Sequence, residues 1–254
     1  MMHDLILDTA ERVFTDHCNK AVRDEAESGP AKDQVALFPE GLWAVVKEAG
    51  LNQVGGKDSG STLADVFRMI RLAGKFALPM PFAEILVSNR FFQGEGLTTV
   101  AEGLVAPWAR RAARIVTDDG QLVTEFDVVQ GSNLAGEPRD EIVFEEFESI
   151  ELPPNFRAIM AMTRVSSMCG GLEKLLELTI DYVGERKQFG RPISGFQAVQ
   201  HNVARMAGEV AASIRASDAA IEAMDTNRFV LQVAAAKVRV GEAAGHLHLL
   251  RAYQ

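Results

Sequence analysis

The sequence predicts a mainly α-helical protein with a small β insert, and three observations support this prediction. Apolar residues recur at helical spacing through the first 95 residues. Short apolar runs separated by turn residues follow in residues 96–155, and helical spacing returns from Phe156 almost to the last residue. We therefore predict an N-terminal α-domain (1–95), a reduced antiparallel β-domain (96–155) and a C-terminal bundle of long helices (156–254).

The N-terminal domain contains four predicted helices, each with apolar residues on one face. They cover residues 5–14, 42–49, 62–74 and 82–92. The second helix ends at Gly50, because glycine favours the left-handed conformation that closes many helices. A glycine-rich loop spans residues 55–60, and Pro79 and Pro81 separate the last two helices.

The middle domain contains short predicted strands separated by turns. The strands cover residues 115–116, 121–124, 128–129 and 142–144. Turn residues separate them, as in Asp118-Asp119-Gly120. We therefore expect a small antiparallel β element here, followed by a linker that Pro153-Pro154 closes.

The C-terminal domain contains three predicted helices. The first covers residues 156–185 and would be about 45 Å long at a rise of 1.5 Å per residue. A connector with Gly190 and Pro192 separates it from a helix over 196–224, whose apolar stripe is typical of a bundle. The last helix runs from about residue 228 towards Gln254 and is rich in alanine, which permits close helix packing.

Charge and composition exclude several classes of protein. The chain has 254 residues and a net charge of −9, which makes a nucleic-acid partner a poor expectation. No apolar run is long enough to predict a membrane span, and the N-terminus does not resemble a secretory signal. We therefore expect a cytoplasmic protein, with Cys18 and Cys169 as reduced thiols. Residues 156–254 carry 12 basic and 9 acidic groups, so an anionic ligand is best sought there.

Several common catalytic and metal-binding motifs are absent. The loop at 55–60 has glycines at P-loop spacing, but the lysine that would contact the phosphates is missing. The five histidines do not form a metal-ligand pattern, and we predict no metal site. The sequence also contains no Rossmann glycine motif and no serine-hydrolase elbow.

The connector between the first two C-terminal helices is the most informative segment. It places Arg186, Lys187 and Arg191 within six residues, with the carboxamides of Gln188 and Gln197 nearby. Guanidinium groups, exposed N–H donors and a helix N-terminus are the groups that bind a pyrophosphate. The alternative interpretation is a charged turn between helices that has no ligand.

The same connector resembles the acyl-CoA dehydrogenase family. It reads Arg-Lys-Gln-Phe-Gly-Arg-Pro-Ile over 186–193 and Phe-Gln-Ala-Val-Gln-His over 196–201, a highly specific pattern. The resemblance extends through residues 156–254 and includes the N-terminal segments 42–51 and 73–81, together with the glycine loop. Both predicted α-domains are therefore similar to those of the family.

The resemblance implies FAD as the cofactor, held at an interface between subunits. The arginine that matches Arg186 contacts the pyrophosphate of a flavin bound mainly by the neighbouring subunit. Gln188, Phe189 and Gln197 match positions that line the same part of FAD, and Gln254 matches a glutamine near the adenosine. Core packing is the alternative interpretation of Phe189.

Two departures from the family pattern concern catalysis. Most members carry the catalytic glutamate beyond the position of Gln254, and a minority carry it near the position of Met160, where this sequence is apolar. Glu173 and Glu177 lie further along the same helix and are interpreted as solvated charges, so we predict no catalytic residue in this chain. The middle domain is also shorter than usual and lacks the Thr-Glu-Pro and Trp-Ile-Thr stretches that hold the flavin ring.

These features lead to a hypothesis of divided function. The chain is interpreted as the smaller subunit of an α2β2 acyl-CoA dehydrogenase that introduces an α,β double bond into a CoA thioester of steroid origin. A larger partner subunit would supply the catalytic glutamate, and an electron-transfer flavoprotein would accept the electrons. Two alternatives stay open, namely a truncated homomeric acyl-CoA dehydrogenase and a non-enzymatic relative that binds acyl-CoA or acts as a scaffold.

Overall fold

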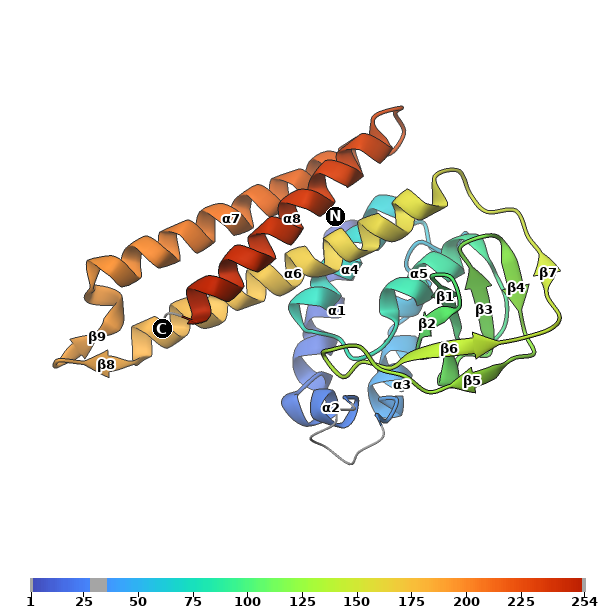
Figure 1. Ribbon diagram of the computed structural model, residues 1–254, viewed down its shortest axis with the longest axis horizontal. Coiled ribbons are helices and arrows are strands. Elements are labelled where there is room, and N and C mark those ends of the chain that lie inside the picture. The colour runs from blue at the N-terminus through green and yellow to red at the C-terminus, as the bar shows by residue number, and fades with distance from the viewer. Residues whose placement is uncertain (1, 28–35, 253–254) are drawn as a thin grey trace. The chain divides into compact units, whose positions relative to one another are not determined.

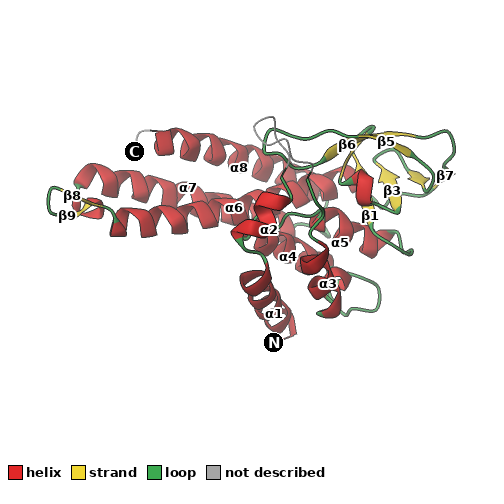
Figure 2. Ribbon diagram, turned by 90° about the horizontal axis from the view of Figure 1, so that it is seen from below, coloured by secondary structure: helices red, strands yellow, loops and turns green. Residues whose placement is uncertain are grey.

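The computed structural model describes residues 2–27 and 36–252 and confirms the predicted fold class (Figures 1 and 2). Helices predominate, and short strands lie between the N-terminal and C-terminal helices in the sequence. The chain divides into two compact units, one of residues 1–69 and 77–157 and the other of residues 70–76 and 158–254. The boundaries of the three predicted domains stay a prediction.

The first unit begins with short helices. They are α1 (Met2–His17), α2 (Lys20–Glu25), α3 (Glu40–Glu48), α4 (Leu63–Lys75, whose last turns belong to the second unit) and α5 (Phe82–Phe91). Helix α4 begins where the sequence predicts, because Thr62 and Asp65 cap it reciprocally. The Thr62 N–H donates to Asp65 Oδ2 at 2.7 Å, and the Asp65 N–H donates to Thr62 Oγ1 at 3.3 Å. The glycine loop before this cap remains a loop.

Aromatic residues hold these helices together. Phe14 of α1 and Phe82 of α5 pack edge to face with ring centroids 5.9 Å apart. Phe67 of α4 and Leu86 of α5 are fully buried. The apolar stripes of the sequence therefore face one core, as their helical spacing predicts.

The β part of the first unit consists of two small sheets. One has the strand order β1-β3-β4-β7 and the other β2-β6-β5. The strands are β1 (Thr98–Ala101), β2 (Val105–Pro107), β3 (Arg114–Thr117), β4 (Gln121–Val123), β5 (Asp127–Val129), β6 (Arg139–Val143) and β7 (Glu148–Ser149). The four predicted strands correspond to β3, β4, β5 and β6, whereas β1, β2 and β7 were not predicted.

One pairing differs from the antiparallel expectation. β1 pairs in parallel with β3, with Thr98 opposite Arg114 and Ala101 opposite Thr117. Parallel neighbours need a long crossover connection, and here the chain passes through β2 of the other sheet before it returns as β3. Local turn residues do not encode such a crossover, so the sequence pattern could not predict it.

A buried ion pair stabilises the β part. Asp140 of β6 is fully buried and accepts hydrogen bonds from the Arg110 side chain and from the Gly131 N–H at 3.2 Å. The carboxylate is therefore paired and hydrogen-bonded, which a buried charge requires. Alanine, valine and isoleucine side chains of both sheets form the surrounding core.

The second unit is built from long helices. They are α6 (Phe156–Glu185), α7 (Gln197–Glu222) and α8 (Phe229–Ala252), with β8 (Lys187–Gln188) and β9 (Arg191–Pro192) between α6 and α7. Helices α6 and α7 run antiparallel, with the two short strands at their joined ends (Figure 1). These bounds agree closely with the predicted helices.

Glycines bring the last turns of α4 against α6. A Cβ at Gly74 would lie 2.1 Å from the carbonyl oxygen of Ser167, and one at Gly170 would lie 1.8 Å from that of Arg71. Only glycine permits such a close approach of two helix backbones.

Among the described residues, no helix has the length and hydropathy to cross a membrane.

Candidate functional site

The candidate site is the hairpin of β8 and β9 at the joined ends of α6 and α7. Lys187 pairs with Pro192 and Gln188 with Arg191, so Phe189 and Gly190 form the two-residue turn. Their φ angles are 52° and 79°, as a type I′ turn requires. The sequence predicted an irregular connector here, because a Phe-Gly pair is not a common signal for this turn.

Phe189 combines a strained backbone with an exposed ring. A left-handed φ is an outlier for a bulky residue and costs free energy, so the surrounding structure must impose it. The ring is 91% exposed and touches Phe196 edge to face, with centroids 6.2 Å apart. Core packing, the alternative interpretation of Phe189, is therefore wrong for this chain.

Three cations of the hairpin have no acidic partner among the described residues. Arg186, Lys187 and Arg191 are exposed and form no ion pair there. The Arg186 guanidinium instead lies 5.8 Å from the centroid of the Tyr182 ring, and that of Arg191 lies 4.3 Å from the centroid of Phe196. The aromatic rings orient the guanidinium groups and leave their N–H donors available to an anion.

The N-terminus of α7 adds backbone donors to the same place. Its N-cap residue, Phe196, has an extended backbone and provides no side-chain cap, and the first turn contains no acidic residue. The carboxamide of Gln200 donates to the carbonyl oxygen of Ser194 at 3.0 Å and closes the connector. The first N–H groups of α7 and the positive end of its dipole therefore face no carboxylate of their own turn.

The structure brings four of the five predicted site residues together. All four are exposed: Arg186 directly precedes β8, Gln188 and Phe189 lie in the hairpin, and Gln197 is the first residue of α7. Gln254 lies outside the described residues. Cations, carboxamides and unshared N–H groups suit a diphosphate anion. Their roles in binding stay a prediction.

Sequence reasoning missed the aromatic support of the two arginines. Tyr182 and Arg186 are four residues apart at the end of α6, and this spacing places them on one helix face. That pairing could have been found from the sequence. The contact of Arg191 with Phe196 could not, because it depends on the turn that reverses the chain.

A family model described as "Acyl-CoA dehydrogenase, C-terminal domain" matches residues 156–248, which include the hairpin, α6, α7 and most of α8. Acyl-CoA dehydrogenase IpdE2 of Mycobacterium tuberculosis is 27% identical over 255 residues, covering 87% of this chain and 80% of that protein. The chain is therefore similar to acyl-CoA dehydrogenases in its C-terminal helices and over most of its length. The resemblance seen in the connector is thereby confirmed.

Solved structures with the same fold extend the similarity to the whole chain. The structure described as "Tcur3481-Tcur3483 steroid ACAD G363A variant" has a TM-score of 0.70 and 20% identity, over 97% of this chain and 86% of that one. The structure described as "PigA with FAD and proline" has a TM-score of 0.76 and 17% identity, over 98% and 86%. At such identities the likeness establishes the fold alone.

The position of a family catalytic base on α6 is apolar in this acyl-CoA dehydrogenase relative. Met160 is 5% exposed, and its neighbours Ile159 and Met162 are also buried. None of these side chains can accept a proton. The prediction that this chain has no catalytic residue stays a prediction, and the environment of Met160 supports it.

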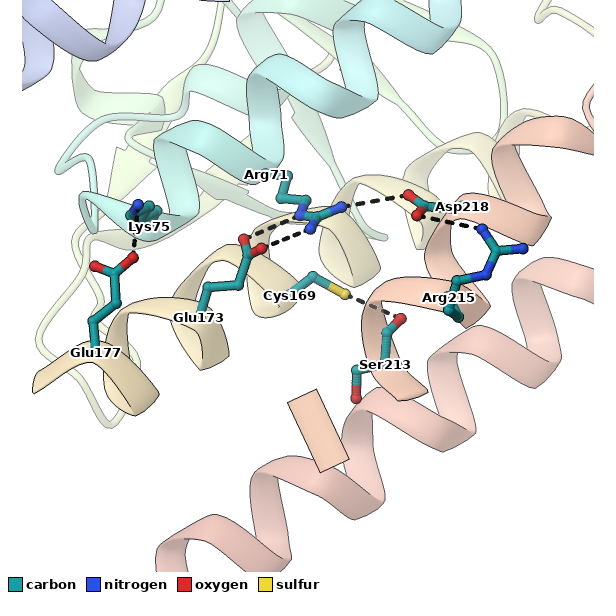
Figure 3. A network of polar contacts seen from close by, with 8 residues as sticks. All are labelled: Arg71, Lys75, Cys169, Glu173, Glu177, Ser213, Arg215 and Asp218. Carbon is teal, nitrogen blue, oxygen red and sulfur yellow. Dashed lines mark hydrogen bonds and ion pairs between the residues drawn. The ribbon is translucent and has the colours of Figure 1, made fainter. Parts of the chain in front are cut away.

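The two carboxylates further along α6 are held in a network of ion pairs (Figure 3). Glu173 accepts from Arg71 Nε at 3.0 Å and from Arg71 Nη2 at 2.6 Å, and Arg71 Nη1 lies 3.4 Å from Asp218 of α7. Glu177 lies 2.8 Å from Lys75 Nζ, and this hydrogen bond lowers the pKa of the Glu177 carboxyl. Both glutamates therefore brace α4 against α6 and are not free bases.

Proposed function

We propose that this chain is the smaller, non-catalytic subunit of a heteromeric FAD-dependent acyl-CoA dehydrogenase. The assembly introduces an α,β double bond into a CoA thioester, and the larger subunit supplies the catalytic glutamate. One observation carries the proposal. The β8–β9 hairpin presents Arg186, Lys187 and Arg191 without acidic partners among the described residues, beside the uncapped N-terminus of α7.

The hairpin fits the diphosphate of FAD in charge and in donor type. Arg186 offers a planar fork of donors already oriented by Tyr182, and the N–H groups of Gln197 and Ala198 begin a helix whose first turn contains no acid. The carboxamides of Gln188 and Gln197 would add neutral hydrogen bonds, and the exposed ring of Phe189 would cover an apolar part of the cofactor. Each of these groups binds and orients the cofactor.

The reaction itself would take place on the partner. FAD held there would supply the acceptor for a hydride from the β-carbon of the thioester, and the partner's glutamate would remove the α-proton. In this chain Met160 stands where some family members carry that glutamate, and Glu173 is engaged with Arg71. The chain's contribution is therefore to hold the cofactor from the far side of a subunit interface.

Exposed apolar side chains on α8 support a partner subunit. Val230, Leu231 and Val238 are 51%, 67% and 62% exposed, although α8 buries Val233 and Val240 on its other face. A helix that is apolar on two faces needs cover beyond what the described residues provide. The structure described as "Tcur3481-Tcur3483 steroid ACAD G363A variant" names two joined proteins, which supports a heteromeric assembly by analogy. The α2β2 stoichiometry is part of our proposal.

The substrate class we propose is a bulky, steroid-derived CoA thioester. One solved structure of the same fold is described as a steroid ACAD, which supports this substrate class. The reduced middle domain also supports it, because a shorter domain would leave room beside the acyl chain. We propose an electron-transfer flavoprotein as the electron acceptor, as the family resemblance implies.

Co-expression tests the proposal. The chain is produced alone and together with the dehydrogenase-like subunit encoded nearest to it, and both samples are separated by size while the flavin absorbance is recorded. We expect flavin to elute only with the mixed complex. A yellow, self-associated chain alone would contradict the proposal and indicate a homomeric enzyme, and a mixed complex without flavin would indicate a scaffold.

A further inference from the structure

The outer face of the β2-β6-β5 sheet does not follow the usual alternation of apolar inside and polar outside. Along β6, Asp140 and Ile142 point inward and are buried, whereas Glu141 and Val143 point outward and are exposed. An antiparallel sheet with one solvated face normally places polar side chains on that face. An outward valine therefore requires explanation.

The strand register places more valines on this outer face. Val105 of β2 and Val129 of β5 lie on either side of Glu141, so the three form one row across the sheet. Val143 pairs with Asp127 of β5 in the next outward row. Directly opposed side chains have Cβ atoms roughly 5 Å apart, so these residues form one continuous patch.

The exposure of the patch is large for valine. Val105, Val129 and Val143 are 42%, 57% and 52% exposed. They lie on three neighbouring strands, so this exposure is shared by a face and is not the isolated apolar residue that most surfaces contain. We call these three valines, with Glu141 and Asp127, the valine–acid face.

The acids of the valine–acid face are not neutralised by the arginines around it. Arg110 bonds to Asp140, Arg111 to Glu40 at 2.6 Å and Arg139 to Glu137 at 3.1 Å. Neither Glu141 nor Asp127 forms an ion pair or side-chain hydrogen bond within the described part of the chain. The central row therefore presents a bare carboxylate between two valines.

We propose that the valine–acid face is a docking surface for the larger subunit of the heteromer, so this inference rests on the proposed function. The contacting surface of that subunit presents an arginine or lysine to Glu141, surrounded by aliphatic side chains. Docking would remove Glu141 from water, and a buried carboxylate is tolerated only when a cation and hydrogen bonds replace its hydration. The required cation makes the contact selective for a basic, apolar surface.

Charge argues against other occupants of the valine–acid face. A second copy that used the same face across a two-fold axis would bring Glu141 and Asp127 towards their own copies, and like charges in contact oppose association. Nucleic acids and anionic membranes are repelled for the same reason. A partner with a different, basic surface remains.

The test compares two charge reversals in the co-expressed complex. Glu141→Lys changes the valine–acid face, and Glu148→Lys makes the same change on β7, an exposed strand of the other sheet. We expect Glu141→Lys to weaken association with the larger subunit by about tenfold or more, and Glu148→Lys by less than about threefold. Backbone amides of β5 and β6 should exchange hydrogen more slowly in the wild-type complex than in the chain alone.

Each outcome of the test is decisive. Equal effects of the two reversals, or unchanged hydrogen exchange in β5 and β6, would overturn the inference. If that complex still contains flavin, the proposed function is unaffected. If no complex forms with the wild-type chain, both fail. If the chain alone dimerises and Glu141→Lys disrupts the dimer, the occupant is a second copy and the inference is wrong. Glu141→Gln, which adds no charge, provides the same comparison if the lysine variant does not fold.

Discussion

Two regions of the second unit use arginine side chains in opposite ways. Arg71 in the ion-pair network forms two hydrogen bonds with Glu173 and lies 3.4 Å from Asp218. Arg186 in the hairpin lies over the ring of Tyr182 and has no ion pair among the described residues. The comparison teaches that an arginine satisfied by its own fold serves stability, whereas an arginine left unsatisfied is available to a ligand.

The largest effect is expected at the hairpin. Arg186→Ala should weaken retention of FAD in the complex by about 2–4 kcal/mol, because a charged hydrogen-bond partner of the diphosphate is removed. The flavin dissociation constant of the purified complex measures this change, which corresponds to roughly 25- to 700-fold. Arg228→Ala, in the turn before α8, removes an exposed arginine at the far end of α7 and is the control. Equal flavin binding by the two variants would show that Arg186 does not contact the cofactor.

The ion-pair network should give the converse result. Arg71→Ala should lower the free energy of unfolding by about 1–3 kcal/mol, because partly buried carboxylates lose their charged hydrogen bonds. Chemical denaturation of the chain measures the loss. Arg215→Ala removes an arginine that is 67% exposed, and its ion pair with Asp218 should contribute less than about 1 kcal/mol. If Arg71→Ala were as stable as Arg215→Ala, the network would have no structural role.

The strained turn should separate stability from binding. Phe189→Asn should raise the free energy of unfolding by about 0.5–1 kcal/mol, because Asn-Gly is favoured in a type I′ turn and a phenylalanine with φ of 52° is not. The same variant should bind flavin more weakly, since the exposed ring is removed. Thermal unfolding of the variant chain gives the first value, and flavin titration of its complex with the larger subunit gives the second. A destabilised variant would show that the ring supports the fold.

The smallest effect concerns pH. Lys75 lowers the pKa of Glu177 below its ordinary value of 4.5, so the folded state favours the ionised carboxyl. The stabilisation is present above pH 4.5 and is lost as the pH falls through the lowered pKa of the folded state. Unfolding of wild type and Lys75→Met is compared between pH 6 and pH 3, and the wild type should lose more stability. Parallel curves would mean that the pair contributes nothing.

Much of the helical architecture follows from local sequence patterns. The apolar stripe and its flanking residues predict a helix over 156–185, and α6 has these bounds. The Thr62–Asp65 cap and the left-handed Gly50 mark helix ends within one turn of the positions that the sequence indicates. These signals act between residues that are neighbours in the chain, so one sequence is enough to find them.

The strand pairing of the β part and the ion pairs depend on contacts between residues that are far apart in the sequence. The strands β1 and β2 were missed, since their short runs acquire meaning only beside β3 and β6. Glu173 looked like any solvated helix charge, because its partner Arg71 lies 102 residues away. Core packing of Phe189 was an open alternative in the sequence, and the 91% exposure of its ring excluded it.

The sequence by itself determined the resemblance to the family, the helices and the place of the cationic connector, because periodicity, capping and a contiguous motif are local properties. Only the tertiary structure decided which charges are already paired and which remain available. It showed that Arg71 is paired with Glu173 whereas Arg186 lies over a tyrosine ring, and that valines of three strands lie on one exposed face. The physical reason is that pairing and burial depend on which segments pack together, and helix or strand propensity does not specify this.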